Sequence, residues 1–549
     1  MLLFPLICCN FVKQSEITTT MEKKQLKECP IGIQDFEKII KNDYLYVDKT
    51  RQMYDLTHGS SKYVFLSRPR RFGQSLLAST LHYYFDGRRD LFKGLAIEQL
   101  EKDWVKYPVL HFDIPPHKEY TLESLDSLLD MQLSAYEKLY NISGREEFKK
   151  YHNIRLEHLI SEAEKQSGNK VVVLIDEYDA PFATKARRGE DIEKIRNMML
   201  NFVAPLKGCD RHLHFVMLIG TIRFTNGHFL SGILNNMTNV SMDEEYADIC
   251  GISKEELTGQ LSDYIDAMAE ANGYTHEKML EELAYRYDGY HFTWPSPDIF
   301  NPFSIINAFS DKRLGNYWFG SGTPTFLIEM MRKFGVAPSQ IGGKRLGANG
   351  FDAPAEKLTS IVPLLYQSGY LTIKDYNPLT ESYTLDIPNE EIRIGLMESL
   401  LPNYVYDRAG EWKPILGDMS LLIREDKIDD ALKILQDFLA SIPQCNNTNY
   451  EGHYQQMLYV IFTLLGYYVD VEVHTADGRI DVVMRTSNTL YLMELKINQS
   501  AETAQKQIDD KEYIKRFVHY KLPIVTVAIN FSTEKHTITG WIIDDPRKA

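Results

Sequence analysis

Two carboxylates and a lysine near the C-terminal end of the chain have types and a spacing suited to metal-dependent cleavage of phosphodiester bonds. Asp481 lies in one apolar stretch and Glu494 in the next, with Ser487 and Asn488 between them. A symmetric antiparallel hairpin centred on Ser487 and Asn488 places Asp481 opposite Glu494, with Cβ atoms roughly 5 Å apart. Carboxylates at that distance repel each other unless a cation lies between them, and hard oxygen ligands favour Mg²⁺.

Lys496 extends this candidate site, because side chains two residues apart on a strand point to the same face. Its ammonium would stabilise the charge that develops on a scissile phosphate, or help to activate water. Glu451, on an expected helix before the hairpin, and Gln507, on an expected helix after it, could complete the metal site. The alternative is a solvent-exposed hairpin whose charges compensate each other. Burial of the hairpin is favoured by four apolar residues: Ile480, Val482, Leu492 and Leu495.

A second candidate site lies near the N-terminal end, where a short apolar run precedes a polar loop and an apolar-periodic helix. Residues 63–66 predict a buried strand, residues 67–73 predict a polar loop, and a helix is expected from Ser75 onward. This order places backbone N–H groups and a helix N-terminus against the phosphates of a nucleotide. The usual pattern is G-x4-G-K-[ST]. Here Gly73 and Ser75 match, whereas Arg68 replaces the first glycine and Gln74 replaces the lysine.

Asp176 and Glu177, which follow the apolar run 171–175, resemble the second half of an NTPase site. Asp176, together with Ser75, would hold Mg²⁺, and Glu177 would orient and deprotonate the attacking water. The alternative is that two polar residues close a strand, and that each nearby arginine is a surface charge or a structural ion pair. The residues expected to contact the nucleotide are Arg70, Arg71, Phe72, Gly73, Gln74, Ser75 and Asp176, with Arg223 as a further phosphate contact.

The elements that must position these residues follow from the apolar pattern. Apolar runs near 63, 109, 171 and 215, separated by helical segments, predict a doubly wound parallel α/β sheet. Between about 240 and 400, short helices and aromatic turns predict a connector or lid, and residues 416–441 predict a pair of helices. The last unit is expected to contain a helix at 451–465, strands at 467–474, 479–486 and 489–497, a helix at 501–517 and a strand at 523–529.

The composition excludes several classes of protein. At 549 residues the chain should hold roughly three or four domains, and a hydrophobic content of 44% indicates a folded protein rather than disorder. A net charge of −15 disfavours a protein whose whole surface binds nucleic acid, although it permits a local basic cleft. The spacing of the six cysteines fits neither a disulfide framework nor a zinc site. This pattern predicts that the protein resides in the reducing environment of the cytoplasm.

The N-terminal segment is expected to lie outside the fold. Residues 1–9 are apolar, but the run is short and no basic segment precedes it. We expect Met21 to be the start of translation; the alternative is a weak export signal. No later stretch approaches the ~18 apolar residues of a membrane span, so no membrane contact is expected.

Several stretches of the chain match a known family pattern. The most specific are Arg-Pro-Arg-Arg-Phe-Gly at 68–73, Gly-Arg-Ile-Asp at 478–481 and Glu-Leu-Lys at 494–496. Further matching stretches are 31–33, 46–50, 174–179, 287–292, 301–304 and 367–372. On these residues the chain resembles, almost from end to end, bacterial AAA-ATPase-like proteins that carry a C-terminal nuclease-like domain of the PD-(D/E)XK superfamily.

The resemblance implies a bacterial cytoplasmic protein with an ATP-binding domain, a connector and a nuclease-like domain, and ATP and Mg²⁺ as cofactors. The family pattern has lysine after Gly73, so Gln74 puts ATP hydrolysis in doubt more than the fold. A neutral amide also gives up a charge-assisted contact with phosphate, which is roughly twice as strong as a neutral one. Arginine at position 68 matches the family pattern.

We therefore expect an N-terminal extension at 1–28, a P-loop NTPase-like domain at 29–238, a mainly helical connector at 239–445 and a restriction-endonuclease-like α/β domain at 446–549. The expected function is Mg²⁺-dependent cleavage of nucleic acid, DNA in preference to RNA, under nucleotide control. The alternative is an ATP-binding switch that does not hydrolyse ATP and whose nuclease-like domain only binds nucleic acid or a partner. Assembly as a homo-oligomer is compatible with either function.

Overall fold

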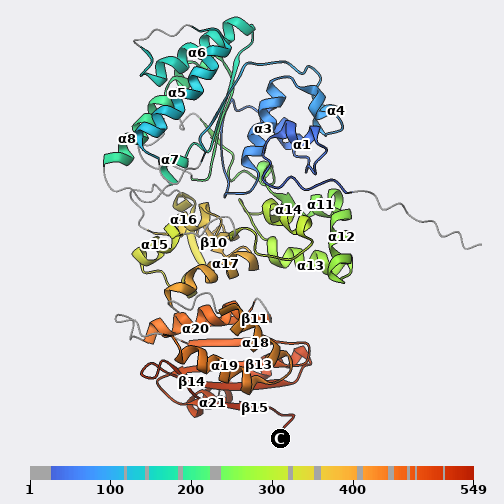
Figure 1. Ribbon diagram of the computed structural model, residues 1–549, viewed down its shortest axis with the longest axis vertical. Helices are drawn as coiled ribbons and strands as arrows, with labels where there is room; N and C mark the ends of the chain where they lie inside the picture. Colours follow the sequence, from blue (N-terminus) through green and yellow to red (C-terminus); the bar gives the residue numbers. More distant parts are fainter. Residues whose placement is uncertain are drawn as a thin grey trace, which may run out of the picture.

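The computed structural model (Figure 1) arranges the chain as three units along its longest axis. A sheet covered by helices lies at one end, a mainly helical region lies in the middle, and a second sheet with its own helices lies at the other end. The structure describes residues 26–115, 120–142, 148–183, 190–222, 237–319, 325–351, 360–404, 412–442, 451–466, 470–476, 479–510 and 513–548. Within these residues, no helix is long and apolar enough to cross a membrane.

The N-terminal unit is built on a five-stranded parallel sheet with the order β2-β3-β4-β1-β5. Because all five strands run in one direction, the loop after β1 and the carboxylates at the end of β3 lie at the same edge of the sheet. Ser67 pairs with Gly220 and Asp113 pairs with Asp176 at this edge. The strands are β1 Tyr63–Ser67, β2 Val109–Asp113, β3 Val171–Asp176, β4 Leu213–Gly220 and β5 Thr238–Asn239.

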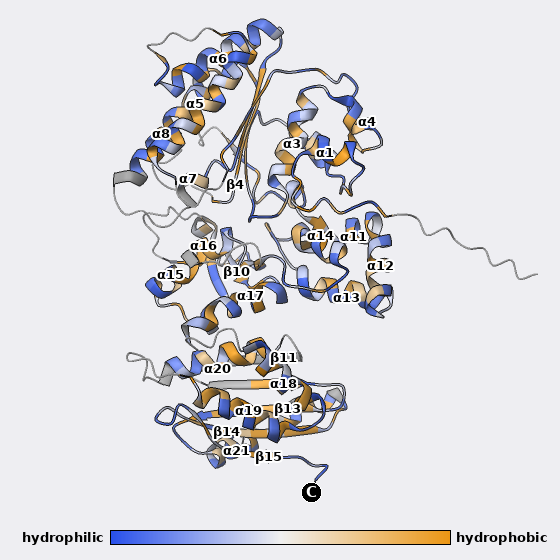
Figure 2. Cartoon of the chain, viewed as in Figure 1, coloured by the Kyte–Doolittle hydropathy of each residue, from blue (hydrophilic) through white to orange (hydrophobic). Residues whose placement is uncertain are grey.

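Helices cover both faces of this sheet, which explains why its strands are apolar at successive positions. Val172 and Leu174 of β3 belong to one core cluster, whereas Val171, Val173 and Ile175 belong to another on the opposite face. Figure 2 shows the hydrophobic strands enclosed between the helices. The predicted α/β fold with a parallel sheet is thus confirmed. The helices on one face are α1 Phe36–Lys41, α3 Gln74–Phe85 and α4 Ile97–Leu100, and those on the other are α5 Leu122–Leu139, α6 His152–Ser167 and α8 Glu190–Val203.

The middle region is mainly helical, but it also contains a three-stranded antiparallel sheet that the sequence did not predict. Its strands, with the order β8-β10-β9, are short, and β8 and β9 each contain two adjacent charged residues, so they lack the apolar run of a buried strand. These strands are β8 Lys344–Gly347, β9 Thr372–Asn377 and β10 Ser382–Asp386. The helices are α11 Lys254–Gln260, α12 Ser262–Asn272, α13 His276–Tyr287, α14 Pro302–Asp311, α15 Thr325–Phe334, α16 Val362–Gln367 and α17 Glu390–Leu400.

The C-terminal unit contains a five-stranded mixed sheet with the order β11-β12-β13-β14-β15. Only β13 and β14 pair in parallel, and helix α21 connects them. The strand β15 was not predicted. The elements are α20 Glu451–Leu465, β11 Asp470–Ala476, β12 Arg479–Arg485, β13 Leu490–Ile497, α21 Ala501–Asp510, α22 Tyr513–Phe517, β14 Ile524–Ser532 and β15 Thr537–Asp544.

Two helices that the sequence analysis placed in the connector pack on this sheet instead. They are α18 Trp412–Arg424 and α19 Ile428–Ala440. Gln436 of α19 donates to the carbonyl of Ile538, and Thr537 donates to the carbonyl of Gln436. The expected boundary at 445/446 therefore separates these helices from the sheet that they cover.

Candidate functional site

The loop after β1 turns sharply into α3 at Gly73, which is the residue that caps the helix. Gly73 has φ of +94°, a left-handed conformation that glycine adopts without strain, and nothing lies within 4 Å of the position that a Cβ would take. Arg71 also has a positive φ, of +71°. The loop thus folds back over the N-terminus of α3, where unpaired backbone N–H groups attract an anion.

Asp176, at the end of β3, lies against the first turn of α3. Its side chain is buried, and burial raises the pKa of this carboxyl to about 6, although a hydrogen bond from the Ser75 hydroxyl opposes the shift. A buried carboxylate beside a hydroxyl has the oxygen donors that Mg²⁺ prefers, and a cation there would relieve the cost of burial. Ser75 and Asp176 therefore fit the predicted metal site.

Glu177 follows Asp176 with a φ of +52°, an uncommon conformation for a residue other than glycine. Burial, reinforced by the charge of Asp176, raises the pKa of Glu177 to about 7. Its Oε2 atom is buried and has no hydrogen-bond partner among the described residues. A carboxylate with a pKa near the working pH is suited to general-base catalysis.

Gln74, which stands where the pattern has lysine, is tied to the end of β4. Its Nε2 atom donates to the carbonyl of Gly220 at 2.6 Å, and the backbone N–H of Arg68 donates to the same carbonyl at 3.1 Å. A Cβ at position 220 would lie 2.3 Å from Oδ1 of Asp179, so only glycine fits there. The amide of Gln74 therefore links α3 to β4 across the edge of the sheet.

Arg68 has a structural role in place of the first glycine. It is 2% exposed and donates to the carbonyls of Ser67, Ser241 and Tyr246. Its guanidinium also lies 4.3 Å from the ring centroid of Phe292. Arginine at this position thus fastens the loop to the segment that follows β5 and to the middle region.

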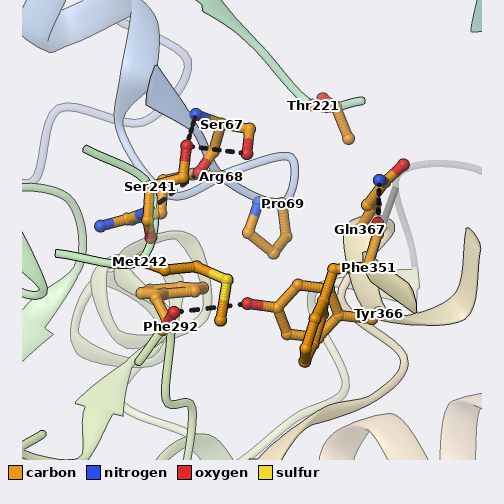
Figure 3. Close-up of a pocket in the computed structure, with 10 residues that line it drawn as sticks. All are labelled: Ser67, Arg68, Pro69, Thr221, Ser241, Met242, Phe292, Phe351, Tyr366 and Gln367. Carbon is orange, nitrogen blue, oxygen red and sulfur yellow. Dashed lines mark hydrogen bonds between the residues drawn. The ribbon is translucent and has the colours of Figure 1, made fainter. Parts of the chain in front are cut away.

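Side chains of the middle region surround the loop. Figure 3 shows a pocket into which Pro69 projects, with Phe351 and Gln367 on the side of the middle region. A Cβ on Gly369 would lie 2.9 Å from Cβ of Pro69. The stretches 287–292, 301–304 and 367–372 are therefore brought to the loop, although the sequence offered no role for them.

Phe72 and Arg71 extend these contacts on the other side of the loop. Phe72 packs edge-on against Tyr290 and Phe292, with centroid distances of 4.8 and 5.2 Å. The Arg71 guanidinium lies 4.0 Å from the ring centroid of Phe303 in α14. The loop is thus held between the parallel sheet and the middle region.

An apolar pocket of about 680 Å³ begins beside Gly73, and the sequence analysis missed it. It lies between the segment before α2 (Thr50–His58), the first turns of α3, and the middle region. The sequence feature that could have indicated this pocket is the pair of family-pattern stretches 46–50 and 301–304, because both contribute residues to its lining. The lining side chains include Pro30, Tyr46, Val47, Leu76, Ile252 and Ile306.

The nuclease-like candidate site lies on β12 and β13 of the C-terminal sheet. Asp481 pairs with Glu494, which confirms the register predicted for this hairpin. Glu494 is 1% exposed, and its Oε1 lies 2.7 Å from Nζ of Lys496. The same Nζ donates to Oε1 of Gln507 in α21 at 2.6 Å. The structure therefore brings Glu494, Lys496 and Gln507 together on one face.

Some predicted site residues are placed only in part. Asp481 lies in β12 and Glu451 is the first residue of α20, but their side chains lie outside the described part of the chain, as do Gly478 and the whole of Arg223. Among the described side chains, no group of three or more His, Cys, Asp or Glu residues could hold a metal ion. The opposed positions of Asp481 and Glu494 still suit oxygen coordination of Mg²⁺.

Comparisons with known proteins match the two regions of the chain in which these candidate sites lie. A family model described as predicted AAA-ATPase matches residues 30–229, and a model of the PD-(D/E)XK nuclease superfamily matches residues 449–541. The chain is 31% identical over 532 residues to a protein of Azotobacter chroococcum mcd 1 described as "Uncharacterized protein in vnfD 5′region". The match covers 94% of this chain and 99% of the relative. No solved structure matches the chain.

The two family models span the two regions that carry the candidate sites, and the relative spans nearly the whole chain, including the middle region between them. The chain belongs to the family of AAA-ATPase-like proteins with a C-terminal nuclease domain of the PD-(D/E)XK superfamily.

Proposed function

We propose that this protein is an ATP-binding, Mg²⁺-dependent nuclease that acts on DNA and is controlled by the nucleotide. The pairing of Asp481 with Glu494 carries the proposal, together with the ion pair between Glu494 and Lys496. The fold supports it as well. A unit with a parallel sheet that matches the AAA-ATPase-like model, a middle region, and a unit that matches the PD-(D/E)XK nuclease model follow one another along the chain.

At the nucleotide site, each part of the surroundings suits a different part of ATP. The loop at 68–75 and the N-terminus of α3 would bind the phosphates, and Ser75 with Asp176 would hold Mg²⁺. The apolar pocket beside Gly73 suits the base, because its lining is mostly apolar and it opens next to the loop. Glu177 would accept the proton of the attacking water.

At the nuclease-like site, Asp481 and Glu494, with Glu451 as a further ligand, would hold Mg²⁺. When bound, the metal supplies Lewis-acid stabilisation of the charge on the phosphodiester. Lys496 is positioned by Gln507 and Glu494, so its ammonium is held beside the place where that charge develops. Gln507 thus orients the lysine.

The test is cleavage of plasmid and linear DNA with Mg²⁺ or Mn²⁺, in the presence and absence of ATP. We expect Glu494→Gln to lower the rate by about a thousandfold, since several kcal/mol of transition-state stabilisation depend on the metal. Glu534→Gln, which changes an exposed glutamate in the turn between β14 and β15, is the matched control. No cleavage by wild type would reject nuclease activity, and equal rates for wild type and Glu494→Gln would reject this site as its origin. Equal rates with and without ATP would reject nucleotide control. A labelled RNA substrate tests the preference for DNA.

A second function, an ATP-binding switch that does not hydrolyse ATP, is favoured by Gln74. Its amide donates to Gly220 and provides no positive charge for the β- and γ-phosphates. In this case ATP binds without turnover, and the nuclease-like unit only binds nucleic acid or a partner. ATP turnover of about 1–100 s⁻¹ that disappears in Glu177→Gln would reject this second function.

A further inference from the structure

The five side chains before Gly73 differ in how firmly the fold holds them. Arg68 is buried and bonded to three carbonyls. Pro69 lies against Gly369, and Phe72 is 1% exposed among aromatic rings. Arg71 lies on the ring of Phe303. The fold therefore accounts for four of the five.

Arg70 is the exception. Its side chain is exposed, and it forms no hydrogen bond, ion pair or ring contact with any described residue. It is the third of the eight residues of the phosphate loop. The loop brings it to the edge of the sheet where β3 ends. Burial raises the pKa of both Glu177 and Asp179, and the positive charge of Arg70 opposes part of that rise. An arginine that is unpaired but close to these carboxylates can turn toward an anion without breaking a contact.

Gln74 supplies no positive charge at the edge of the parallel sheet where the phosphates of a nucleotide are expected. Lysine at this position would reach the β- and γ-phosphates, whereas the amide of Gln74 is neutral and is bonded to Gly220. Arg68 cannot supply the charge, because its guanidinium is enclosed by the backbone of Ser241 and Tyr246. Arg71 is turned toward α14.

We propose that Arg70 is the cation that faces the terminal phosphate of a bound nucleoside triphosphate and supplies the charge that Gln74 lacks. The assignment rests on the proposed nucleotide binding. An arginine that stabilises the terminal phosphate is known as a catalytic device in other phosphoryl-transfer proteins, where it is supplied within the chain or by a partner. Here it comes from the phosphate loop itself. Its planar fork can form two hydrogen bonds with one phosphate.

The experiment measures affinities for ATP and ADP with Mg²⁺ by titration calorimetry. We expect Arg70→Ala to weaken ATP binding by about tenfold to a hundredfold, the range for a hydrogen bond to a charged group. ADP binding should change much less, because ADP lacks the terminal phosphate. The double variant Arg70→Ala/Gln74→Lys should recover ATP affinity, because it moves the positive charge from position 70 to position 74. Arg89→Ala, an exposed arginine beyond the other end of α3, is the control.

The outcomes separate this assignment from the proposed function. If wild type binds ATP and Arg70→Ala binds it equally well, the assignment alone is overturned. If Arg70→Ala weakens ATP and ADP alike and lysine at position 74 gives no recovery, the arginine has a structural role and the assignment is again overturned. If wild type binds no nucleotide, both the proposed function and the assignment of Arg70 to the terminal phosphate are rejected. Arg70→Gln, checked for folding by thermal unfolding, serves as a second variant with the same expectations.

Discussion

The nuclease-like candidate site takes its charged side chains from two neighbouring strands of one sheet. The candidate nucleotide site depends instead on the loop at 68–75, which the parallel sheet and the middle region hold in place. Glu494 and Lys496 are both almost fully buried and are paired with each other. Arg70 is exposed at the tip of its loop and has no described partner. The charges of Glu494 and Lys496 are part of the fold, whereas the charge of Arg70 is available to a ligand.

The largest expected effect follows from this difference. Lys496→Met should lower the free energy of unfolding of the C-terminal unit by about 3–5 kcal/mol, because it leaves Glu494 buried without its ammonium partner. Urea-induced unfolding measures the loss. The exposed Lys433 of α19, which pairs with Asp429 and Asp430, provides the control, and Lys433→Met should cost less than about 1 kcal/mol. The double variant Glu494→Gln/Lys496→Met should regain most of the stability. Equal losses for the two lysine variants would show that the buried pair is not part of the fold.

The loop at 68–75 contains one arginine of each kind, because Arg68 is buried and hydrogen-bonded whereas Arg70 is exposed. Arg68→Met should destabilise the N-terminal unit by about 3 kcal/mol, because it removes the guanidinium that donates to the carbonyls of Ser67, Ser241 and Tyr246, two of these bonds being buried. Arg70→Ala should have almost no effect on stability, because Arg70 is exposed. Thermal unfolding measures both, and hydrogen exchange at residues 241–246 shows whether that segment loosens. If the two variants lose stability equally, Arg68 does not fasten the loop.

Local rules predicted the pairing of residues on the C-terminal hairpin, and they located the N-terminal loop, but they did not predict the contacts of Arg68 and Gln74 in that loop. The period of two along a strand and the position of the turn were enough to pair Asp481 with Glu494, and the structure has that register. The roles of Arg68 and Gln74 depend instead on Tyr246, Phe292 and Gly220, which lie far away in the chain. No local pattern contains those partners.

The same limit applies to the fold. Buried strands such as β3 were predicted because five successive apolar residues have one explanation in a parallel sheet. The sheet β8-β10-β9 was missed because its strands are half exposed and charged. The helices α18 and α19 were predicted correctly as helices but assigned to the wrong unit, because an amphipathic pattern predicts a buried face without indicating which sheet covers it.

Gln74→Lys tests whether the loop still has room for the usual cation. We expect ATP affinity to rise about tenfold, since a charged donor binds phosphate roughly twice as strongly as a neutral amide. Calorimetry measures the affinity, and phosphate release shows whether turnover increases as well. Gln99→Lys adds the same charge at an exposed position of α4. Equal ATP affinities for these two variants would show that position 74 does not reach the phosphates.

The smallest expected effect is a pH dependence at the carboxylates beside the loop. Burial, together with Asp176, raises the pKa of Glu177 to about 7, and Arg70 opposes the rise. The unfolded carboxyl has a pKa near 4.3, so the folded state binds this proton more tightly and its stabilising effect is lost as the pH rises toward 7. In Glu177→Gln the melting temperature should therefore fall less between pH 5 and pH 8, by about 2 °C for a group that is partly solvated.

Glu193→Gln, in which an exposed glutamate of α8 is replaced, should follow the wild-type pH dependence. Asp176 remains in the Glu177→Gln variant, and its own raised pKa leaves part of the slope in place. If Glu177→Gln and Glu193→Gln have the same slope, Glu177 is ionised at pH 5 and is not held as an acid by its surroundings. Glu177 would then titrate like a carboxylate at the protein surface. The carboxylate beside the loop would differ in this respect from Glu494, which is buried and paired with Lys496.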